Sequence, residues 1–486
     1  MKLRDLIADM PYLKDTRGSM ETEVCQITSN SREKVENGLF FCISGARFDA
    51  HNFAPQAVGN GCIALVVERF LPELDVPQVL VSNGRAAMSR MAAAFYGHPA
   101  REMKLVGVTG TKGKTTATSM LKAICEQAGY KCGLIGTTGN MIGQKRMNSN
   151  YTTPDPIELQ ATLRAMADEG VEIVSMEVSA HAIDMHRLDG MVFEVGCYTN
   201  LSQDHLDYFH TMDNYFETKK RFFTSGMVRN ATFNADEETT VRAMDGVTVP
   251  RMTYGICADA DFYARDIEIS EDGVSFEMQL HKMSSVNVNL HMTGMFNVYN
   301  ALAAASCAMI LGVSAEDIRL GLESMLSVPG RIEMLPTGTP YRVILDYAHS
   351  PDALENILKT VRQFAKGRVI ALFGCGGDRD QGKRPIMGEI GGRLADLCIL
   401  TSDNPRSEDP MAILAAVEEG IKSTGKPYEM IENRREAIRR ALTVAREGDV
   451  IILAGKGHET YQEIQGVKHP FDEKIVVQEL LEEIRG

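Results

Sequence analysis

The residues best suited to chemistry follow a short apolar stretch near position 105. Residues 105–108 are predicted to form a buried strand, and the glycines after them permit a tight turn with exposed backbone N–H groups. These N–H groups and the N-terminus of a helix predicted from Lys114 onward would form an anion site. Lys114 offers a cation to phosphate oxygens, and the Thr115 hydroxyl is a suitable magnesium ligand. The pattern predicts nucleotide phosphate binding by Gly110, Thr111, Lys112, Gly113, Lys114, Thr115 and Thr116.

This loop matches the shorter Gly-x-x-Gly-Lys-Thr form of the phosphate loop. The longer form has a glycine where this chain has Val108. The alternative is a glycine-rich turn that binds nothing. That alternative leaves Lys114 unexplained, because a cation at a helix N-terminus is disfavoured unless an anion offsets it.

Polar side chains follow two further predicted strands. The apolar stretch 171–176 is followed by Glu177, and the stretch 192–197 leads to a polar loop that contains His205. Ligands of parallel sheets bind beyond the carboxyl ends of the strands. A carboxylate and an imidazole there could complete a magnesium site with nucleotide oxygens. On spacing alone, an ordinary polar loop explains these residues equally well.

The elements that must position these residues are strands alternating with helices, which predicts an α/β protein. A chain of 486 residues is too long for one core. We expect a small N-terminal α/β domain over 1–102, a central domain with a P-loop-type, mostly parallel sheet over 103–330, and a C-terminal Rossmann-like α/β domain over 331–486. Within the central domain, residues 232–293 are expected to form an antiparallel insertion.

Composition excludes several classes of protein. The net charge of −14 argues against a nucleic-acid or anionic-membrane surface, although a local basic site remains compatible with it. The ten cysteines include no C-x-x-C pair, which favours buried free thiols over disulfides or zinc. We find no signal-peptide pattern and no apolar run near 18 residues. These features predict a cytoplasmic protein without membrane insertion or nucleic-acid partners.

Five sets of motifs, in order along essentially the whole chain, resemble the Mur ligases of peptidoglycan synthesis. They are the phosphate loop, residues 176–181 (Met-Glu-Val-Ser-Ala-His), residues 200–207 (Asn-Leu-Ser-Gln-Asp-His-Leu-Asp), residues 346–349 (Asp-Tyr-Ala-His), and three C-terminal loops at 374–380, 403–406 and 455–459. Within the family, the likeness is greatest to the members that add the third residue of the peptide.

The resemblance implies an ATP- and Mg²⁺-dependent amide ligase. It would add meso-diaminopimelate to the D-glutamate of UDP-MurNAc-L-Ala-D-Glu through an acyl phosphate. We expect small-molecule substrates and a monomer. Three alternatives stay open: the same reaction with L-lysine or another diamino acid, a ligase like folylpolyglutamate synthase, and a non-catalytic nucleotide-binding scaffold. The N-terminal domain disfavours the second alternative, because folylpolyglutamate synthases begin close to their phosphate loop. The third is disfavoured because a non-catalytic scaffold is expected to have lost catalytic residues, and all of the expected ones are present.

The resemblance also implies residue roles around ATP. Lys114, Glu177, His205 and Lys219 would be catalytic, and Thr115, Glu177, His205 and Lys219 would hold the metal, Lys219 as a carbamate. Asn297, Arg331 and Asp346 would join the phosphate loop in binding ATP. Read without the resemblance, Lys219 in a Lys-Lys-Arg run is typical of a solvated helix face.

Two further sets of residues would bind the other substrates. The UDP-sugar dipeptide would lie between the first two domains and contact Ser29, Ser31, Ala46, Arg47, Phe48, Thr152, Thr153, Ser179 and Arg187. The amino acid would contact Arg379, Asp403, Asn404, Pro405, Arg406, Gly455 and Glu459 in the C-terminal domain.

Arg406 is expected to select meso-diaminopimelate. A guanidinium can grip the second carboxylate of that amino acid in a bidentate manner, whereas lysine would place an ammonium there. Glu459 would receive the far ammonium group by charge. The alternative is that Arg406 caps a helix or pairs with Glu408 or Asp409.

Overall fold

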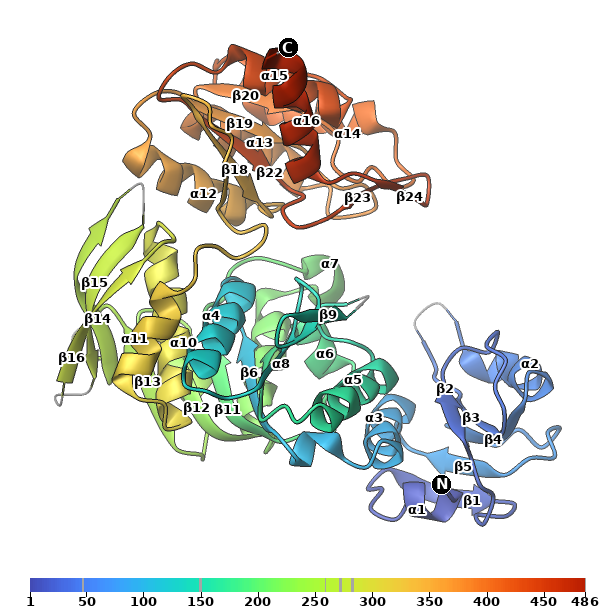
Figure 1. Ribbon diagram of the computed structural model, residues 1–486. Coiled ribbons are helices and arrows are strands. Elements are labelled where there is room, and N and C mark those ends of the chain that lie inside the picture. Colours follow the sequence, from blue (N-terminus) through green and yellow to red (C-terminus); the bar gives the residue numbers. More distant parts are fainter. Residues whose placement is uncertain (46–47, 148–150, 258, 271–272, 281–283, 486) are drawn as a thin grey trace.

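The computed structural model describes residues 1–45, 48–147, 151–257, 259–270, 273–280 and 284–485. Three larger β-sheets follow one another along the chain, each flanked by helices. In Figure 1 the C-terminal part lies above the central part, and the N-terminal part lies to the right of it. The mixed α/β class predicted from the sequence is confirmed.

The N-terminal sheet has the strand order β1-β5-β4-β3-β2. Successive residues of its middle strands point to opposite faces, as strand geometry requires. Leu39 and Phe41 pack toward α3, while Phe40 packs on the other face toward α2. The elements are α1 (Leu3–Leu6), β1 (Leu13–Arg17), β2 (Gln26–Thr28), β3 (Gly38–Phe41), η1 (Ala50–Phe53), α2 (Ala54–Gly59), β4 (Cys62–Val67), β5 (Gln78–Val81), α3 (Gly84–Phe95) and η2 (Pro99–Arg101).

The central sheet contains eleven strands in the order β16-β15-β14-β13-β12-β11-β6-β10-β7-β8-β9. Its first elements are β6 (Lys104–Thr109), α4 (Lys114–Gln127), β7 (Cys132–Ile135), β8 (Asn140–Ile142), β9 (Lys145–Met147), α5 (Pro156–Asp168), β10 (Ile173–Glu177), α6 (Ala180–Asp184), β11 (Phe193–Tyr198), α7 (Leu206–Phe209) and α8 (Met212–Thr224). The others are β12 (Val228–Asn234), α9 (Thr240–Met244), β13 (Arg251–Gly255), β14 (Phe262–Ile269), β15 (Val274–Leu280), β16 (Ser284–Leu290), α10 (Met295–Ile310) and α11 (Ala315–Glu323).

Strand β6 lies in the middle of this sheet and is buried on both faces. Val106 and Val108 pack with helices α4 and α10, whereas Leu105 packs with α5 and α8 on the opposite face. Strands β7, β10, β6 and β11 are mutually parallel, so their carboxyl ends meet at one edge. That edge holds the phosphate loop and the polar segments after β10 and β11.

The expectation of an antiparallel insertion over 232–293 is wrong in part. Strands β12, β13 and β14 continue the parallel sheet outward from β11, and the antiparallel pairs within the described part of 232–293 are β14–β15 and β15–β16. Alternation of apolar and polar residues suggested short antiparallel strands. Alternation reports which faces are covered, but it does not report the direction of the neighbouring strand.

The C-terminal sheet has the order β17-β18-β22-β19-β20-β21, and a separate hairpin of β23 and β24 follows it. Helices α12, α13 and α14 cover one face, while α15 and α16 cover the other. The elements are β17 (Glu333–Leu335), β18 (Arg342–Asp346), α12 (Pro351–Phe364), β19 (Val369–Phe373), α13 (Lys383–Leu394), β20 (Leu397–Leu400), α14 (Pro410–Lys422), β21 (Tyr428–Met430), α15 (Arg434–Val444), β22 (Val450–Ala454), β23 (Tyr461–Ile464), β24 (Val467–Pro470) and α16 (Glu473–Arg485).

Specific polar contacts join the three parts. The Tyr12 hydroxyl donates to Asp189 Oδ2 at 2.7 Å, and helix α3 packs on α5. Across the other junction, Lys112 Nζ donates to Ser350 Oγ at 2.8 Å. Among the helices in the described ranges, none combines the length and apolar character needed to cross a membrane.

Candidate active site

A cavity of about 390 Å³ lies where the central and C-terminal parts meet. Its central walls come from the phosphate loop and from loops after β7, β10 and β11, and its C-terminal wall comes from residues around β18 and α12. The sequence-predicted residues that line it are Thr111, Lys112, Gly113, Lys114, Thr115, Thr116, Thr152, Glu177, Ser179, His205, Arg331 and Asp346.

The phosphate loop needs glycine at two positions, because of backbone conformation and because of lack of space. Gly110 has φ +147° and Gly113 has φ +85°, a region that residues with a Cβ rarely adopt. A Cβ at Gly110 would also collide with Thr199 Oγ1, and one at Gly113 would collide with Asn300 Oδ1. The loop can therefore turn sharply into the start of α4, and Asn200 holds it, since Thr111 N donates to Asn200 O at 2.9 Å and Lys112 N donates to Asn200 Oδ1 at 2.8 Å.

Lys114 is the first residue of α4 and folds back over the loop. Its Nζ donates to Gly110 O at 2.9 Å and to Thr111 O at 2.8 Å. Burial lowers the pKa of the Lys114 ammonium to about 8. The group is still mainly protonated at pH 7, but its charge is poorly compensated within the protein.

Lys219 on helix α8 is buried, with 1% of its surface exposed, so the reading of a solvated helix face is wrong. Its Nζ donates to Gly110 O at 2.8 Å and lies 4.3 Å from the centroid of the Tyr215 ring. Burial, and then the charge of Lys114, hold the pKa of Lys219 well below its ordinary value. The neighbouring Lys220 pairs instead with Asp245 at 3.0 Å.

Glu177 closes the cavity at the end of β10. The side chain is almost completely buried, and it accepts from Thr137 N at 2.7 Å and from Thr137 Oγ1 at 3.2 Å. These two bonds fix the carboxylate at the cavity wall. Thr137 is a functional neighbour that motif reasoning missed, because nothing in its local sequence points to Glu177.

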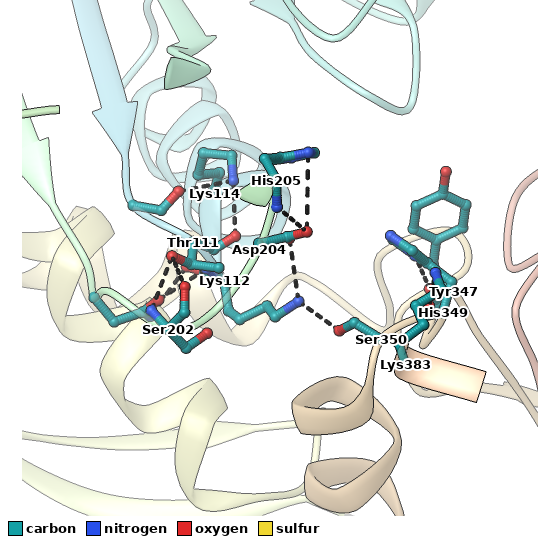
Figure 2. A network of polar contacts seen from close by, with 12 residues as sticks. Thr111, Lys112, Lys114, Ser202, Asp204, His205, Tyr347, His349, Ser350 and Lys383 are labelled. Carbon is teal, nitrogen blue, oxygen red and sulfur yellow. Dashed lines mark hydrogen bonds and ion pairs between the residues drawn. The ribbon is translucent and has the colours of Figure 1, made fainter. Parts of the chain in front are cut away.

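Asp204 and His205 follow β11, and Figure 2 shows Asp204 between Lys112 and His205. Burial alone would raise the pKa of Asp204, but nearby positive charge, chiefly that of Lys112 at 3.7 Å, lowers it to about 2. His205 adopts a left-handed φ of +55°, and its ring centroid lies 4.7 Å from that of His181. Burial lowers the pKa of His205, which keeps its imidazole neutral and able to ligate a metal.

The donor set fits a magnesium ion that is shared with a nucleotide. Among the residues that the structure describes, no three His, Cys, Asp or Glu side chains converge as a complete metal cage. Magnesium does not require one, since it retains waters and binds through one or two carboxylates plus substrate phosphates. Glu177 and the hydroxyl of Thr115 both face the cavity and supply oxygen ligands of the preferred kind.

The C-terminal part contributes a cation and a buried acid to the same cavity. Arg331 Nη2 donates to Thr115 Oγ1 at 3.3 Å. Asp346 Oδ2 accepts from Ile332 N and its Oδ1 accepts from Ala348 N, both at 2.8 Å, while burial raises the pKa of this carboxyl. Asp346 therefore shapes the loop that carries Arg331.

Asn297 does not line the cavity, although the resemblance placed it at ATP. Its Nδ2 donates to Thr293 O at 2.9 Å, and its Oδ1 accepts from Asn300 Nδ2 at 3.3 Å. The residues of α10 that line the cavity are Phe296, Tyr299 and Asn300, and Asn300 lies one turn further along the helix than Asn297. The sequence signal that could have identified Asn300 is its spacing of three residues from Asn297, which places the two side chains near the same face of a helix.

The predicted UDP-sugar residues lie in two separate places. Thr152 and Ser179 line the cavity, and Thr153 Oγ1 donates to Glu177 O at 2.8 Å. Arg187 Nη1 donates to Thr153 O at 2.5 Å, and its Nη2 lies 2.9 Å from Asp155 Oδ1.

The N-terminal members of that set are not in the cavity wall. Ser29 is exposed, Ser31 Oγ donates to Gln56 Oε1 at 3.1 Å, and Phe48 is 72% exposed. Ala46 and Arg47 lie outside the described residues.

The predicted amino-acid residues follow the carboxyl ends of β19, β20 and β22, and none of them is among the residues that line the 390 Å³ cavity. Arg406 Nη1 donates to Gly377 O at 2.7 Å, and its Nε lies 3.3 Å from Glu463 Oε2. The alternative partner for Arg406, Glu408, instead accepts from Arg384 at 2.9 Å.

The remaining members of the amino-acid set differ in how firmly they are held. Arg379 is exposed, and its Nη1 donates only to Asp378 O at 3.1 Å among the described contacts. Asp403 is 6% exposed, and a Cβ at Gly455 would collide with Asp403 Oδ2. Asn404 Nδ2 donates to Glu459 Oε2 at 2.9 Å. Pro405 lies between Asn404 and Arg406 and has a buried side chain.

Comparison with known proteins places this arrangement in one family. The profile of the Mur ligase middle domain matches residues 108–308, and that of the Mur ligase, glutamate ligase domain matches residues 330–457. A UDP-N-acetylmuramoyl-L-alanyl-D-glutamate–2,6-diaminopimelate ligase of Clostridium acetobutylicum is 42% identical, covering 100% of both chains. The enzyme of that name from Caldanaerobacter subterraneus is 44% identical over 99% of each chain. A solved structure of such a ligase superposes with a TM-score of 0.71 at 31% identity, covering 100% of this chain and 99% of that one.

Proposed function

The chain belongs to the Mur ligase family, and from that premise we propose that it is an ATP-dependent ligase that joins meso-diaminopimelate to the D-glutamate of UDP-N-acetylmuramoyl-L-alanyl-D-glutamate. Relatives carrying that name match the chain from end to end at 42–44% identity. The reaction forms one amide bond and converts ATP to ADP and phosphate, and it contributes to peptidoglycan precursor synthesis.

The observation that carries the proposal is the set of cations around one cavity. The ammonium groups of Lys112 and Lys114 and the guanidinium of Arg331 line it, and the buried Lys219 contacts the same loop. Polyphosphate is the ligand that such a concentration of positive charge fits, and the glycine turn and helix N-terminus of α4 add backbone donors. We assign ATP to this cavity.

The first chemical step transfers the γ-phosphoryl group to the D-glutamate carboxylate. A carboxylate oxygen forms the new bond to phosphorus while the bond to the ADP oxygen breaks. Lys114, held by Gly110 O and Thr111 O, and Arg331, held near Thr115, are positioned to stabilise the negative charge on the transferring group. Glu177 and Ser179 line the same cavity, and we expect the acceptor carboxylate to enter beside them.

In the second step the amine nitrogen of the amino acid attacks the acyl carbon. The carbon–oxygen bond to phosphate breaks, inorganic phosphate leaves, and the nitrogen loses a proton. The protein's contribution is chiefly positioning, since a well-oriented amine and acyl phosphate react as if at very high concentration.

Thr115, Glu177, His205 and a carbamate of Lys219 are the groups that we expect to hold magnesium. The ion would offset phosphate charge when bound. Lys219 is suited to forming the carbamate because its lowered pKa leaves more of the amine neutral. In that reaction the nitrogen bonds to the carbon of CO₂, an oxygen takes the displaced electron pair, and one N–H proton is released.

The substrates are assigned to three regions. We place the UDP-sugar dipeptide between 1–102 and the central part, ATP in 103–330, and the amino acid in 331–486. Because Phe48 and Ser31 do not share a cavity with Thr152, binding is expected to bring the N-terminal part toward the central part. We also propose that the enzyme works as a cytoplasmic monomer on small-molecule substrates only.

Arg406 is the basis for proposing meso-diaminopimelate over L-lysine. One guanidinium N–H donates to Gly377 O and Nε forms an ion pair with Glu463, which orients the side chain and leaves other N–H donors of the five for a substrate carboxylate. Lysine has no carboxylate at its far end to use them.

The test is ADP release by the purified full-length protein with ATP, Mg²⁺ and UDP-MurNAc-L-Ala-D-Glu. Meso-diaminopimelate, L-lysine, other diamino acids, and a folate-plus-glutamate mixture are compared in parallel. We expect release to depend on the UDP-dipeptide and to be most efficient with meso-diaminopimelate. Preference for L-lysine would overturn the amino-acid assignment alone, whereas no release with any acceptor would overturn the ligase.

A further inference from the structure

Lys456 lies at the predicted amino-acid site but was not among the residues expected there. It directly follows Gly455 at the end of β22, and none of its surface is exposed. Its Nζ donates to Asn404 Oδ1 at 3.0 Å and to Glu459 Oε2 at 3.1 Å. A buried ammonium is costly unless it is paired and hydrogen-bonded, so these two partners explain how the protein tolerates it.

The contacts of Lys456 fix the orientation of the Asn404 amide. Asn404 Oδ1 accepts both from Lys456 Nζ and from Glu463 N at 2.9 Å, so the oxygen must face these two donors. The amide nitrogen then points to Glu459 Oε2, to which it donates at 2.9 Å. Flipping the amide would set its N–H₂ group against two donors.

The same contacts occupy the carboxylate of Glu459 before any substrate binds. Its Oε2 accepts from both Lys456 and Asn404, and its Oε1 lies 3.4 Å from the Tyr347 hydroxyl. Glu459 therefore does not act as an unpaired anion. By contrast, no described residue donates a hydrogen bond to the buried carboxylate of Asp403.

We propose that Lys456 is a positioning residue for the amino-acid substrate. It holds Glu459 and Asn404 in their binding orientation, and it neutralises Glu459 so that Asp403 carries the uncompensated negative charge of the site. This inference rests on the proposed function, because it assumes that these residues bind the diamino acid. The anion of Asp403 and the cation of Arg406 together suit a far end that carries both an ammonium and a carboxylate.

Loss of the Lys456 charge makes the site more negative by one unit. The carboxylate of meso-diaminopimelate is then repelled, whereas the lone far ammonium of L-lysine is attracted. Lys456→Met should therefore raise the KM for meso-diaminopimelate by about tenfold or more. The preference for meso-diaminopimelate over L-lysine should fall, and the KM for ATP should stay unchanged.

A double-mutant cycle distinguishes positioning from a general structural role. If Lys456 acts through Glu459, adding Lys456→Met to Glu459→Gln should change the KM for meso-diaminopimelate much less than it does in the wild type. The matched control is Lys468→Met, whose exposed ammonium lies 4.2 Å from the Tyr461 ring and makes no described contact with Glu459. It should leave all kinetic constants unchanged.

The full-length variants are assayed by ADP release over a range of each substrate, with thermal unfolding followed in parallel. The inference is overturned if Lys456→Met leaves the amino-acid KM and preference unchanged. It is also overturned if the variant lowers kcat and raises every KM alike in both the wild-type and Glu459→Gln backgrounds. If the wild type itself shows no amino-acid-dependent ADP release, the proposed function fails instead.

Discussion

Lys114 and Lys219 bury their ammonium groups against backbone carbonyl oxygens, whereas Lys456 buries its ammonium against a carboxylate. At the phosphate loop, both lysines share Gly110 O, and neither forms a salt bridge with any residue in the described ranges. In the C-terminal site, Lys456 and Glu459 form an ion pair at 3.1 Å. The two lysines at the phosphate loop therefore lack an anionic partner within the described residues, whereas Lys456 has one.

This difference indicates which kind of ligand each region is suited to bind. Burial lowers the pKa of Lys114 to about 8 and that of Lys219 well below its ordinary value, so an added anion would relieve both groups. Phosphate oxygens or a carbamate carboxylate would supply it. Lys456 in the C-terminal site needs no such added anion, because its ammonium is already paired with Glu459.

Lys114→Ala should produce the largest loss, because it removes a cation from the phosphoryl group in the transition state. We expect kcat to fall by about 10²–10³-fold or more. ADP release at saturating substrates measures this effect. The control is Lys122→Ala. Lys122 lies further along α4, and its ammonium pairs with Glu126 at 2.7 Å. Near-normal turnover in Lys114→Ala would remove the phosphate loop from the mechanism.

Lys219→Ala should be nearly inactive and should regain some activity with short carboxylic acids. The reason is that a small carboxylate can replace the anion that a carbamate would place beside the loop. ADP release with and without added acetate or formate measures the rescue. Lys220→Ala is the matched control, because the adjacent lysine pairs with Asp245 and should be dispensable. A fully active Lys219→Ala enzyme would contradict the assignment.

Arg406→Ala should lower kcat/KM for meso-diaminopimelate by about two to three orders of magnitude. Losing one partner of a desolvated charge pair costs roughly 2–5 kcal/mol, and each 1.4 kcal/mol is tenfold. The KM for ATP should change little, since Arg406 does not line the nucleotide cavity. Arg393→Ala, an exposed arginine on α13, serves as the control. Unchanged use of meso-diaminopimelate would assign specificity elsewhere.

The phosphate loop could be predicted from sequence because its signals are local. A β-strand, two glycines with positive φ and a lysine at a helix start follow one another within residues 104–116. Strands β6, β10 and β11 likewise lie close to the predicted stretches 105–108, 171–176 and 192–197, since each is an apolar run that ends in a polar loop.

Long-range relations were harder to predict. Lys219 lies in a charged run, and its burial depends on helix α8 packing against a loop more than one hundred residues earlier in the chain. Lys456 contacts Asn404 across 52 positions, and the parallel direction of β12 to β14 depends on strand order. None of these relations has a signature within a short window of sequence.

The smallest predicted effect concerns stability, and its sign differs between the two regions. Lys114→Met should raise the free energy of unfolding of the ligand-free protein by about 1–2 kcal/mol at pH 7, because it removes a poorly compensated buried charge. Lys456→Met should lower this free energy by about 1–3 kcal/mol, because it leaves Glu459 without its cation. Urea unfolding at several pH values measures both.

The pH dependence makes this last comparison sharper. The pKa of Lys114 is about 8 in the folded protein and 10.5 when unperturbed. Between these values the unfolded chain holds more protons on this group than the folded one, so the contribution of Lys114 to stability rises with pH. The advantage of Lys114→Met over the wild type should therefore be fully present below pH 8 and fade toward pH 10.5. Tyrosines and cysteines that titrate in this range cancel in the difference between the two proteins. A constant difference across this range would mean that the Lys114 ammonium is already balanced, and the contrast between the two regions would not hold.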